Sequence, residues 1–238
     1  MMRQAVVLVG GKGTRLGEIT RAVPKPLLEI EENVRFIDYL LDRLARHGVE
    51  EILLLAGHLG NVVERYYHGR RFRGARVEVI QEPAPAGTGG ALLYVGKRLD
   101  PTFLMLNGDS LFDFEYALLP PALQEQDIAA LALRQVDDGG RYGTVNVKDG
   151  RILDFREKRS DLASSCWISA GTYALRREIL DYISSTPCSI ESEVFPALAK
   201  EGRIAGRAFN GYFIDIGLPN TLEQARRELP SLGLHSKP

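Results

Sequence analysis

Residues 5–30 read AVVLVGGKGTRLGEITRAVPKPLLEI, and this stretch decides the fold. Its first five residues are apolar and mostly β-branched, which is typical of a strand buried on both faces of a parallel sheet. The strand gives way to the glycine-rich run Gly10–Gly13, where backbone N–H groups can approach a ligand closely. Successive N–H groups in such a turn form an anion site, to which Lys12 and Arg15 add positive charge. The stretch therefore predicts a cradle for a polyphosphate.

Two familiar phosphate-binding motifs do not fit this loop. The dinucleotide fingerprint G-x-G-x-x-G requires a glycine one position before Gly17, and the Walker A loop requires Ser or Thr where Gly13 stands. An ordinary glycine-rich turn between a strand and a helix is the structural alternative. Ten residues after Arg15, the sequence Pro24-Lys25-Pro26 holds one lysine between two prolines of fixed φ. Lys25 is thus a candidate second cationic group for the same phosphates.

The composition restricts the class of protein. The chain has 238 residues, with 30 Lys and Arg against 31 Asp and Glu. It thus lacks the excess of positive charge that would indicate binding to nucleic acid or to a membrane surface. Its two cysteines have no metal-ligand spacing, and no apolar run approaches the length of a transmembrane helix. We expect a cytoplasmic protein with a single domain over residues 1–229 and a disordered tail at residues 230–238. The sequence does not fix the oligomeric state, and a homodimer is compatible with it.

Hydrophobic patterning predicts the fold class. Helical and extended patterns alternate along the first half of the chain, with helices expected at 36–44 and 59–67 and strands at 51–56, 77–80 and 102–106. This alternation favours an α/β fold with a doubly wound, mostly parallel sheet. Residues 142–155 predict a hairpin that turns at Asp149-Gly150, and with the strand at 169–175 they form a small β-rich edge. The last expected strand pair covers residues 204–209 and 212–216.

Polar residues follow several of these strands. Asp109 comes directly after the strand at 102–106, where a carboxylate either holds a metal ion or caps the next turn. Asp215 lies between apolar residues, and a buried carboxylate is unfavourable unless it is paired or metal-bound. The run Gly87–Gly90 is expected to begin a helix whose N-terminal amides face an anion or a base edge. A plain loop leading into a helix is the alternative there.

The order of the motifs points to a family. G-G-x-G-T-R-L, P-K-P, G-T-G-G-A-L, N-G-D, R-Y-G with a later E-K, and D-I-G together resemble the sugar-1-phosphate nucleotidylyltransferases, over about residues 5–229. The resemblance implies catalytic roles for Arg15, Lys25 and Asp109, and a Mg²⁺ ion held by Asp109 and Asp215. It also implies a nucleotide site and a sugar-phosphate site. The nucleotide site would comprise Leu8, Val9, Gly10, Gly11, Gly13, Thr14, Arg15, Glu82, Gly87, Thr88, Asn107 and Gly108, and the sugar-phosphate site Gly143, Glu157, Lys158 and Gly171.

The expected reaction joins a nucleoside triphosphate to a sugar 1-phosphate and releases pyrophosphate. Glu82 only accepts hydrogen bonds, and guanine offers two adjacent donors, so this residue favours GTP over UTP, dTTP or CTP. The stretches G-R-Y-G-T-V, S-I-E-S-E-V-F-P and G-Y-F-I-D-I-G-L-P resemble most the D-glycero-α-D-manno-heptose 1-phosphate guanylyltransferases of this family, which make GDP-heptose for surface polysaccharides such as capsules. Mannose 1-phosphate remains an alternative sugar, as do uridylyl or thymidylyl transfer to another sugar. A nucleotide-sensing regulatory subunit is the non-enzymatic alternative.

Overall fold

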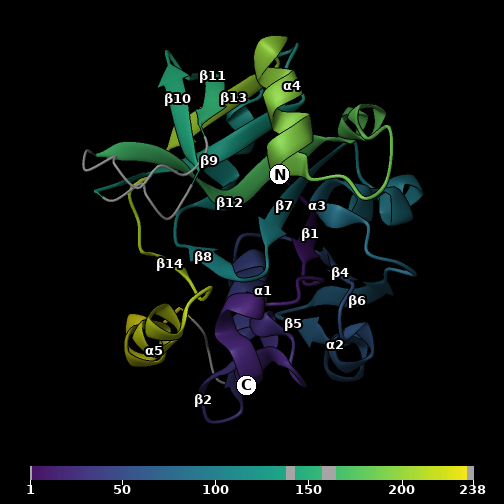
Figure 1. Cartoon of the computed structure of the whole chain (residues 1–238), viewed down its shortest axis with the longest axis vertical. Coiled ribbons are helices and arrows are strands. Elements are labelled where there is room, and N and C mark those ends of the chain that lie inside the picture. Colours follow the sequence, from purple (N-terminus) through teal and green to yellow (C-terminus); the bar gives the residue numbers. More distant parts are fainter. Residues whose placement is uncertain (1, 138–142, 157–164, 235–238) are drawn as a thin grey trace. The chain divides into compact units, whose positions relative to one another are not determined.

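The computed structural model describes residues 2–137, 143–156 and 165–234, which fall into two compact units (Figure 1). The first unit comprises residues 1–86, 105–111 and 212–238, and the second comprises residues 87–104 and 112–211. Each unit thus draws on segments that are far apart in the sequence. The residues of the single domain predicted for 1–229 are divided between these two units.

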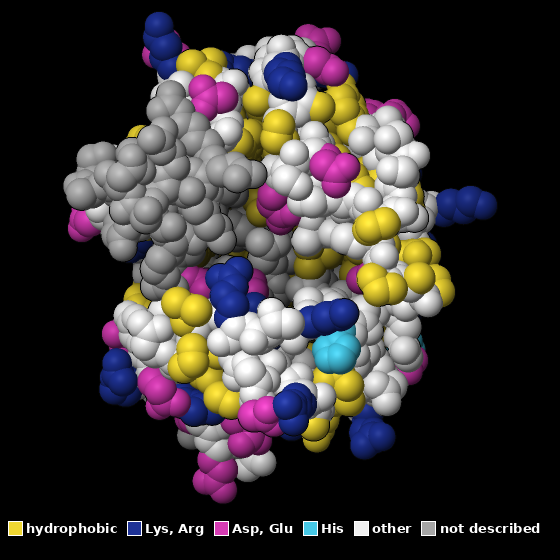
Figure 2. Space-filling view, in the orientation of Figure 1, with side chains coloured by type: hydrophobic (Ala, Val, Ile, Leu, Met, Phe, Trp, Pro, Cys, Tyr) yellow, Lys and Arg dark blue, Asp and Glu magenta, His cyan; other side chains and the backbone are white. Residues whose placement is uncertain are grey.

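The distribution of charge on the surface and the length of the helices fit the composition of the chain. Positive and negative side chains are interspersed on the face shown in Figure 2, as the near-equal counts of acidic and basic residues lead one to expect. No helix in the described ranges is long and apolar enough to cross a membrane.

The first unit contains the predicted parallel sheet. Its strand order is β7-β1-β4-β6-β5, in which β7 contributes its residues from Met105 onward, and β1 pairs with β4 and β4 with β6 in parallel. The strands are β1 (Gln4–Leu8), β4 (Glu51–Ala56), β5 (Arg71–Phe72), β6 (Ala75–Gln81) and β7 (Thr102–Asn107). The residues Ala5, Val6 and Val7 of β1 and the centre of β4 are fully buried, as continuous apolar runs in a parallel sheet should be. The two-residue strand β5, antiparallel to β6, was not predicted because it is too short to show a periodicity.

Helices α1 (Phe36–Arg46), α2 (Gly60–Tyr67) and α5 (Pro219–Glu228) also belong to the first unit, and the positions of α1 and α2 confirm the predicted helical patterns. Two small ladders complete it. Strand β2 (Glu29–Glu31) pairs with β3 (Val34–Arg35), and β14 (Phe213–Asp215) pairs with β8 (Ser110–Phe112). The expectation that residues 212–216 pair with 204–209 is therefore wrong, because β14 joins β8 instead.

One apolar cluster lies at the centre of these elements. Its members come from the loop after β1, from helices α1 and α5, and from both strands of the β8–β14 ladder: Leu16, Leu28, Ile30, Val34, Phe36, Tyr39, Leu40, Leu111, Ile214, Ile216, Leu222, Ala225, Leu229 and Leu234. The tail differs from the expectation here. Residues Leu229–Leu232 form a 3₁₀ turn and Leu234 is buried in this cluster, so disorder is not found in residues 230–234.

The second unit is a closed ring of five strands. The strand order is β10-β11-β13-β9-β12, and β10 pairs again with β12. The pairings are antiparallel except that of β13 with β9. The strands are β9 (Ala129–Val136), β10 (Thr144–Lys148), β11 (Arg151–Arg156), β12 (Cys166–Arg176) and β13 (Ile204–Ala208). The predicted small β-rich edge is thus part of a larger mixed ring, and the doubly wound parallel sheet describes the first unit only in part.

Short helices cover this ring. The α-helices are α3 (Gly87–Gly90) and α4 (Phe195–Lys200), a π-helical turn spans Ile190–Val194, and 3₁₀ segments span Ala91–Arg98, Tyr116–Leu118, Pro120–Ala122 and Arg177–Tyr182. Pro120 begins the second of two short 3₁₀ segments, because a proline cannot continue the hydrogen bonding of the helix before it. The hairpin turn is also confirmed, because Asp149 and Gly150 have φ values of 50° and 75°, as a type I′ turn requires.

A buried ion pair ties β11 to the segment that precedes β9. Asp127 is fully buried and accepts hydrogen bonds from Arg151 at both carboxylate oxygens, 2.6 and 2.8 Å away. The backbone N–H of Gln124 also donates to Asp127. The substitution Asp127→Ala should lower the free energy of unfolding by about 3 kcal/mol, because it leaves the partly buried Arg151 cation without its carboxylate partner. Urea unfolding followed by circular dichroism measures this difference.

The matched control is Glu223→Ala, which removes the acid from an exposed ion pair with Arg226. Exposed pairs contribute about 0–1 kcal/mol. Equal losses for the two variants would contradict a special role for the buried pair.

Candidate active site

The glycine-rich loop after β1 is held by contacts on both sides. Gly10 packs against the turn after β4: a Cβ at Gly10 would lie 2.8 Å from the backbone N of Gly57, and the Gly10 carbonyl accepts a hydrogen bond from the N–H of His58. Gly13 has a φ of 63°, which favours glycine. The Thr20 hydroxyl donates to the Gly13 carbonyl at 3.0 Å. The loop is thus fixed in shape.

After Gly13 the chain forms a kinked 3₁₀ segment, Thr14–Thr20. Leu16 is buried in the apolar cluster, whereas its neighbours Thr14 and Arg15 are exposed, as is Lys12. The burial of one side chain therefore directs the adjacent cationic side chain outward, as a phosphate site needs.

Lys25 and Asp109 are brought together. The segment Lys25–Leu27 forms a single 3₁₀ turn, and the Lys25 ammonium lies 2.7 Å from Asp109 Oδ2. Both side chains are partly buried. Pro26 packs beside Gly108, where an added Cβ would lie 3.3 Å from Pro26 Cγ and clash with the Leu8 carbonyl oxygen. The small size of Gly108 thus allows the Pro-Lys-Pro segment to approach the turn that carries Asp109.

The second predicted metal ligand lies beside the first. The N–H of Ile216 donates to the backbone carbonyl of Asp109 at 3.0 Å, so Asp215 and Asp109 come from neighbouring segments (Figure 1, β8 and β14). Asp215 Oδ1 accepts a hydrogen bond from the N–H of Gly217 at 3.0 Å. A Cβ at Gly217 would lie within 3.9 Å of both Asp215 Oδ1 and Arg15 Nη1. The four predicted polar residues therefore gather at one place in the first unit.

The donor set suits a magnesium ion. No group of three or more potential metal-ligating side chains occurs in the described ranges, so the candidate is the pair of carboxylates. Mg²⁺ commonly uses one or two protein carboxylates and takes its other ligands from substrate phosphates and water. Near this pair, at the end of β7, the side-chain oxygen of Asn107 is buried without a hydrogen-bond partner in the described structure. Hard oxygen ligands are thus available at this point.

Glu82 forms the other side of the loop. It follows β6, and its N–H donates to the Ala56 carbonyl at 2.8 Å. Its carboxylate lies over the two glycines, because a Cβ at Gly10 would be 2.9 Å from Oε1 and a Cβ at Gly57 would be 3.4 Å from Oε2. Burial raises the pKa of Glu82 above its ordinary value, and a hydrogen bond from the Ala86 N–H offsets part of that rise.

The predicted nucleobase loop is tied to its own unit. The N–H groups of Gly89 and Gly90 both donate to the Cys188 carbonyl, so the expectation that these amides face a ligand is wrong. The Thr88 hydroxyl donates to Glu191 Oε2 and accepts from the N–H of Ile190. These bonds shape the loop around Gly87 and Thr88. The roles of those two residues in nucleotide binding stay predictions.

The predicted sugar-phosphate residues lie in the second unit or outside the described ranges. Gly143 is exposed and comes directly before β10. Gly171 is buried, has a φ of 71° and lies at a bulge in β12 between Ser169 and Tyr173. Glu157 and Lys158 are outside the described residues.

Sequence reasoning missed two residues that shape the site, Gly57 and Thr20. Gly57 follows β4, the strand next to β1, and the carboxyl ends of neighbouring parallel strands meet at one edge of a sheet. That position was the available signal for Gly57. Thr20 carried no signal of its own, because its hydrogen bonds depend on the kinked shape of the segment.

Comparisons with known proteins identify the family of the chain. Residues 4–231 match the family model described as Nucleotidyl transferase. The chain is 34% identical over 218 residues to the D-glycero-alpha-D-manno-heptose 1-phosphate guanylyltransferase of Campylobacter jejuni, covering 91% of this chain and 95% of that protein. It is 35% identical over 231 residues to the mannose-1-phosphate guanylyltransferase of Mycobacterium tuberculosis, covering 94% of this chain and 64% of that protein.

Comparison with a solved structure also supports membership of this family. The crystal structure of HddC from Yersinia pseudotuberculosis complexed with GMP-PN aligns with a TM-score of 0.84 at 27% identity, over 96% of this chain and all of that one. The resemblance seen in the sequence is confirmed. The chain belongs to the nucleotidyl transferase family and is a sugar-1-phosphate nucleotidyltransferase.

Proposed function

We propose that the protein is a guanylyltransferase that joins GTP to D-glycero-α-D-manno-heptose 1-phosphate, forming GDP-heptose and pyrophosphate for surface polysaccharide synthesis. The observation that carries the proposal is the gathering of Arg15, Lys25, Asp109 and Asp215 beside the glycine-rich loop of the first unit. Similarity to the Campylobacter jejuni protein supports the choice of sugar. The similarity to the mannose-1-phosphate guanylyltransferase of Mycobacterium tuberculosis favours mannose 1-phosphate as the second candidate. A cytoplasmic location fits substrates of this kind and is part of the proposal.

The proposed reaction needs no side-chain nucleophile. An oxygen of the sugar 1-phosphate attacks the α-phosphorus of GTP, a new P–O bond forms, and the bond to the β-phosphate oxygen breaks as pyrophosphate leaves. The attacking group is already an anion, so catalysis consists of positioning and charge neutralisation. The fixed loop Gly10–Gly13 would hold the triphosphate through backbone N–H groups. Arg15 and Lys25 would balance the negative charge that grows on the leaving group.

The two carboxylates are proposed to hold Mg²⁺. When bound, this ion would neutralise charge at the phosphates between the attacking and the leaving oxygen. Asp109 and Asp215 would supply its protein ligands, and the Lys25 ammonium beside Asp109 would be within reach of the same phosphates. On the sugar side, Gly143, Gly171, Glu157 and Lys158 would bind the hydroxyls and the phosphate.

The metal proposal predicts that Asp109→Asn and Asp215→Asn each lower turnover by about two orders of magnitude or more, because an amide is a much weaker ligand for Mg²⁺ than a carboxylate. Pyrophosphate release measures the effect, and circular dichroism verifies the fold. Asp113→Asn, a change of the same kind in the second unit, should keep nearly normal turnover. Near-normal activity in either of the first two variants would exclude that residue as a metal ligand.

The charge-neutralisation proposal predicts that Arg15→Ala and Lys25→Ala lower kcat more than they raise KM for GTP, because the charge on the leaving pyrophosphate grows in the transition state. We expect a loss of kcat of about 100-fold or more for each variant, as for other groups aimed at developing charge. Lys12→Ala, which changes an exposed cation of the same loop, is the comparison. If only KM changed for Arg15 and Lys25, these residues would serve binding alone.

The nucleobase proposal predicts that GTP gives the highest kcat/KM among GTP, UTP, dTTP and CTP, assayed with heptose, mannose and glucose 1-phosphates. Glu82→Gln should raise KM for GTP about tenfold or more and leave KM for UTP nearly unchanged, because a carboxamide cannot accept both guanine donors. If UTP or dTTP with glucose 1-phosphate is the best pair, both the nucleotide and the sugar assignments fail.

The same residue gives a pH dependence. Guanine binding requires the ionised carboxylate of Glu82, so it is at full strength above the raised pKa and is lost as pH falls through it. KM for GTP should therefore begin to rise at a pH above 4.5, the ordinary value of a glutamate. This rise should disappear in Glu82→Gln. A rise that persists in that variant would mean that another group titrates.

A further inference from the structure

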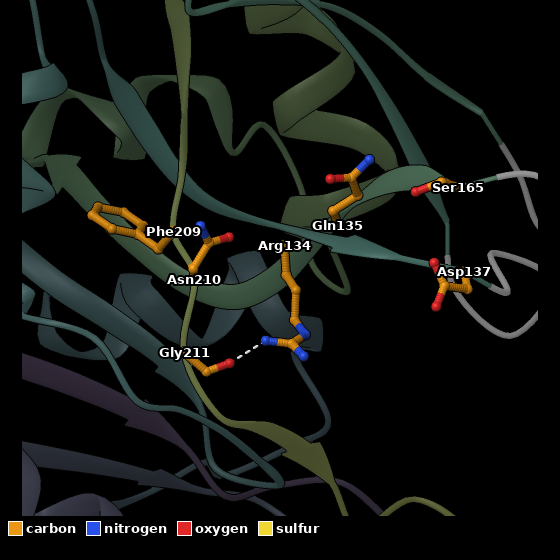
Figure 3. A pocket seen from close by; sticks show the side chains of 7 residues that line it. All are labelled: Arg134, Gln135, Asp137, Ser165, Phe209, Asn210 and Gly211. Atoms are coloured by element: carbon orange, nitrogen blue, oxygen red, sulfur yellow. Dashed lines mark hydrogen bonds between the residues drawn. The ribbon is translucent and has the colours of Figure 1, made fainter.

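The second unit contains a polar pocket that none of the proposed roles uses. It has a volume of about 530 Å³, which is in the range of small-molecule sites (Figure 3). Arg134 and Gln135 come from the end of β9, with Asp137 just beyond it, and Ser165 directly precedes β12. Phe209, Asn210 and Gly211 follow β13. The pocket thus lies where three strands of the ring begin or end.

The wall formed by residues 209–211 is held in place. The Arg134 guanidinium donates to the Gly211 carbonyl, the contact drawn in Figure 3. A side chain at Gly211 would overlap the Asp113 carbonyl, so only glycine fits there. The Phe209 ring stacks on Phe114 with centroids 4.1 Å apart, and Phe209 is almost fully buried. A fixed wall lowers the entropy cost of ordering the site when a ligand binds.

The chemistry of the lining suits hydroxyl groups. Gln135, Asp137, Ser165 and Asn210 are all exposed, and they offer two amides, one carboxylate and one hydroxyl. Amides and hydroxyls both donate and accept, as the hydroxyls of a sugar do. The positive charge of Arg134 is offset by the negative charge of Asp137, which gives no preference for a strongly anionic ligand. The lining therefore favours a neutral polyhydroxyl group.

Strand registers relate the pocket to the predicted sugar residues. Ile168 on β12 pairs with Arg134 on β9 and with Thr144 on β10, so these three residues lie on adjacent strands. Neighbouring strands are about 4.8 Å apart, which puts the backbone of Thr144 roughly 10 Å from that of Arg134. Gly143 directly precedes Thr144. The pocket and Gly143 thus lie on neighbouring strands of the same unit.

We propose that this pocket reads the exocyclic hydroxyls of the substrate sugar, with Gln135 and Asn210 as specificity-determining residues. The inference rests on the proposed function, which assigns the sugar ring and its phosphate to Gly143, Gly171, Glu157 and Lys158. The hydroxyls left unassigned are those on the side chain beyond the ring. A heptose carries two of these, mannose carries one, and 6-deoxymannose carries none.

The test compares three substrates with GTP: D-glycero-α-D-manno-heptose 1-phosphate, α-D-mannose 1-phosphate and 6-deoxy-α-D-mannose 1-phosphate. For the wild-type protein, kcat/KM should fall by about three- to tenfold for each hydroxyl removed. Gln135→Ala and Asn210→Ala should each reduce the differences in kcat/KM among the three sugars. The reason is a higher KM for the heptose, and KM for GTP should stay unchanged. Gln126→Ala, an exposed glutamine of the same unit outside the pocket, should keep the wild-type series. Circular dichroism verifies the fold of each variant.

Direct binding separates this inference from the proposed function. Saturation-transfer NMR titrations of the same sugar phosphates need no turnover. If the wild-type protein binds them in the expected order but releases no pyrophosphate with any nucleotide, the proposed function fails and the pocket assignment stands. The pocket assignment is overturned if both alanine variants keep the wild-type order of affinities, or if the wild-type protein does not distinguish the three sugars.

Discussion

The candidate active site depends on one apolar cluster in the first unit. Arg15 is next to buried Leu16, Asp109 is two residues before buried Leu111, and Asp215 lies between buried Ile214 and Ile216. In extended segments, side chains alternate between two faces, so burial of Ile214 and Ile216 turns Asp215 the other way. Burial of these apolar neighbours thus helps to position the polar groups, together with the ion pair of Lys25 with Asp109 and the hydrogen bond from Gly217 to Asp215. Catalysis by positioning and electrostatics requires this rigidity, because groups that must first reorient stabilise a transition state poorly.

The charges that the cluster brings together constrain one another. Two carboxylates on neighbouring segments repel, and that repulsion is larger in a partly buried site than in water. The Lys25 ammonium, 2.7 Å from Asp109, offsets part of this cost. In the proposed function, the same arrangement would let one place bind both a metal ion and phosphates. Two cations, Arg15 and Lys25, near the two carboxylates keep the net charge of the place small.

The sequence predicted those structural features that a short, continuous pattern of residues determines. The parallel strands, the loop at Gly10–Gly13 and the hairpin turn at Asp149-Gly150 were found because a continuous apolar run or a turn pair specifies each of them. The closed ring was not predicted, because its strands pair with partners that are distant in the sequence, such as β13 with β9. No periodic pattern of residues reveals such a pairing. Contacts between distant residues were missed for the same reason. Lys25 and Asp109 are 84 positions apart, and Thr88 and Glu191 are 103 apart.

In the proposed guanylyl transfer, burial of Glu82 would contribute to the choice of nucleobase. The small size of Gly10 and Gly57 lets its carboxylate lie against their backbone, and burial raises its pKa despite the hydrogen bond from Ala86. A desolvated carboxylate with few donors is costly, and a ligand that supplies two donors relieves that cost. Guanine does so, whereas uracil would turn an acceptor oxygen toward the carboxylate. The discrimination would then come mainly from the penalty on the wrong base, which is the route by which polar sites achieve large selectivity.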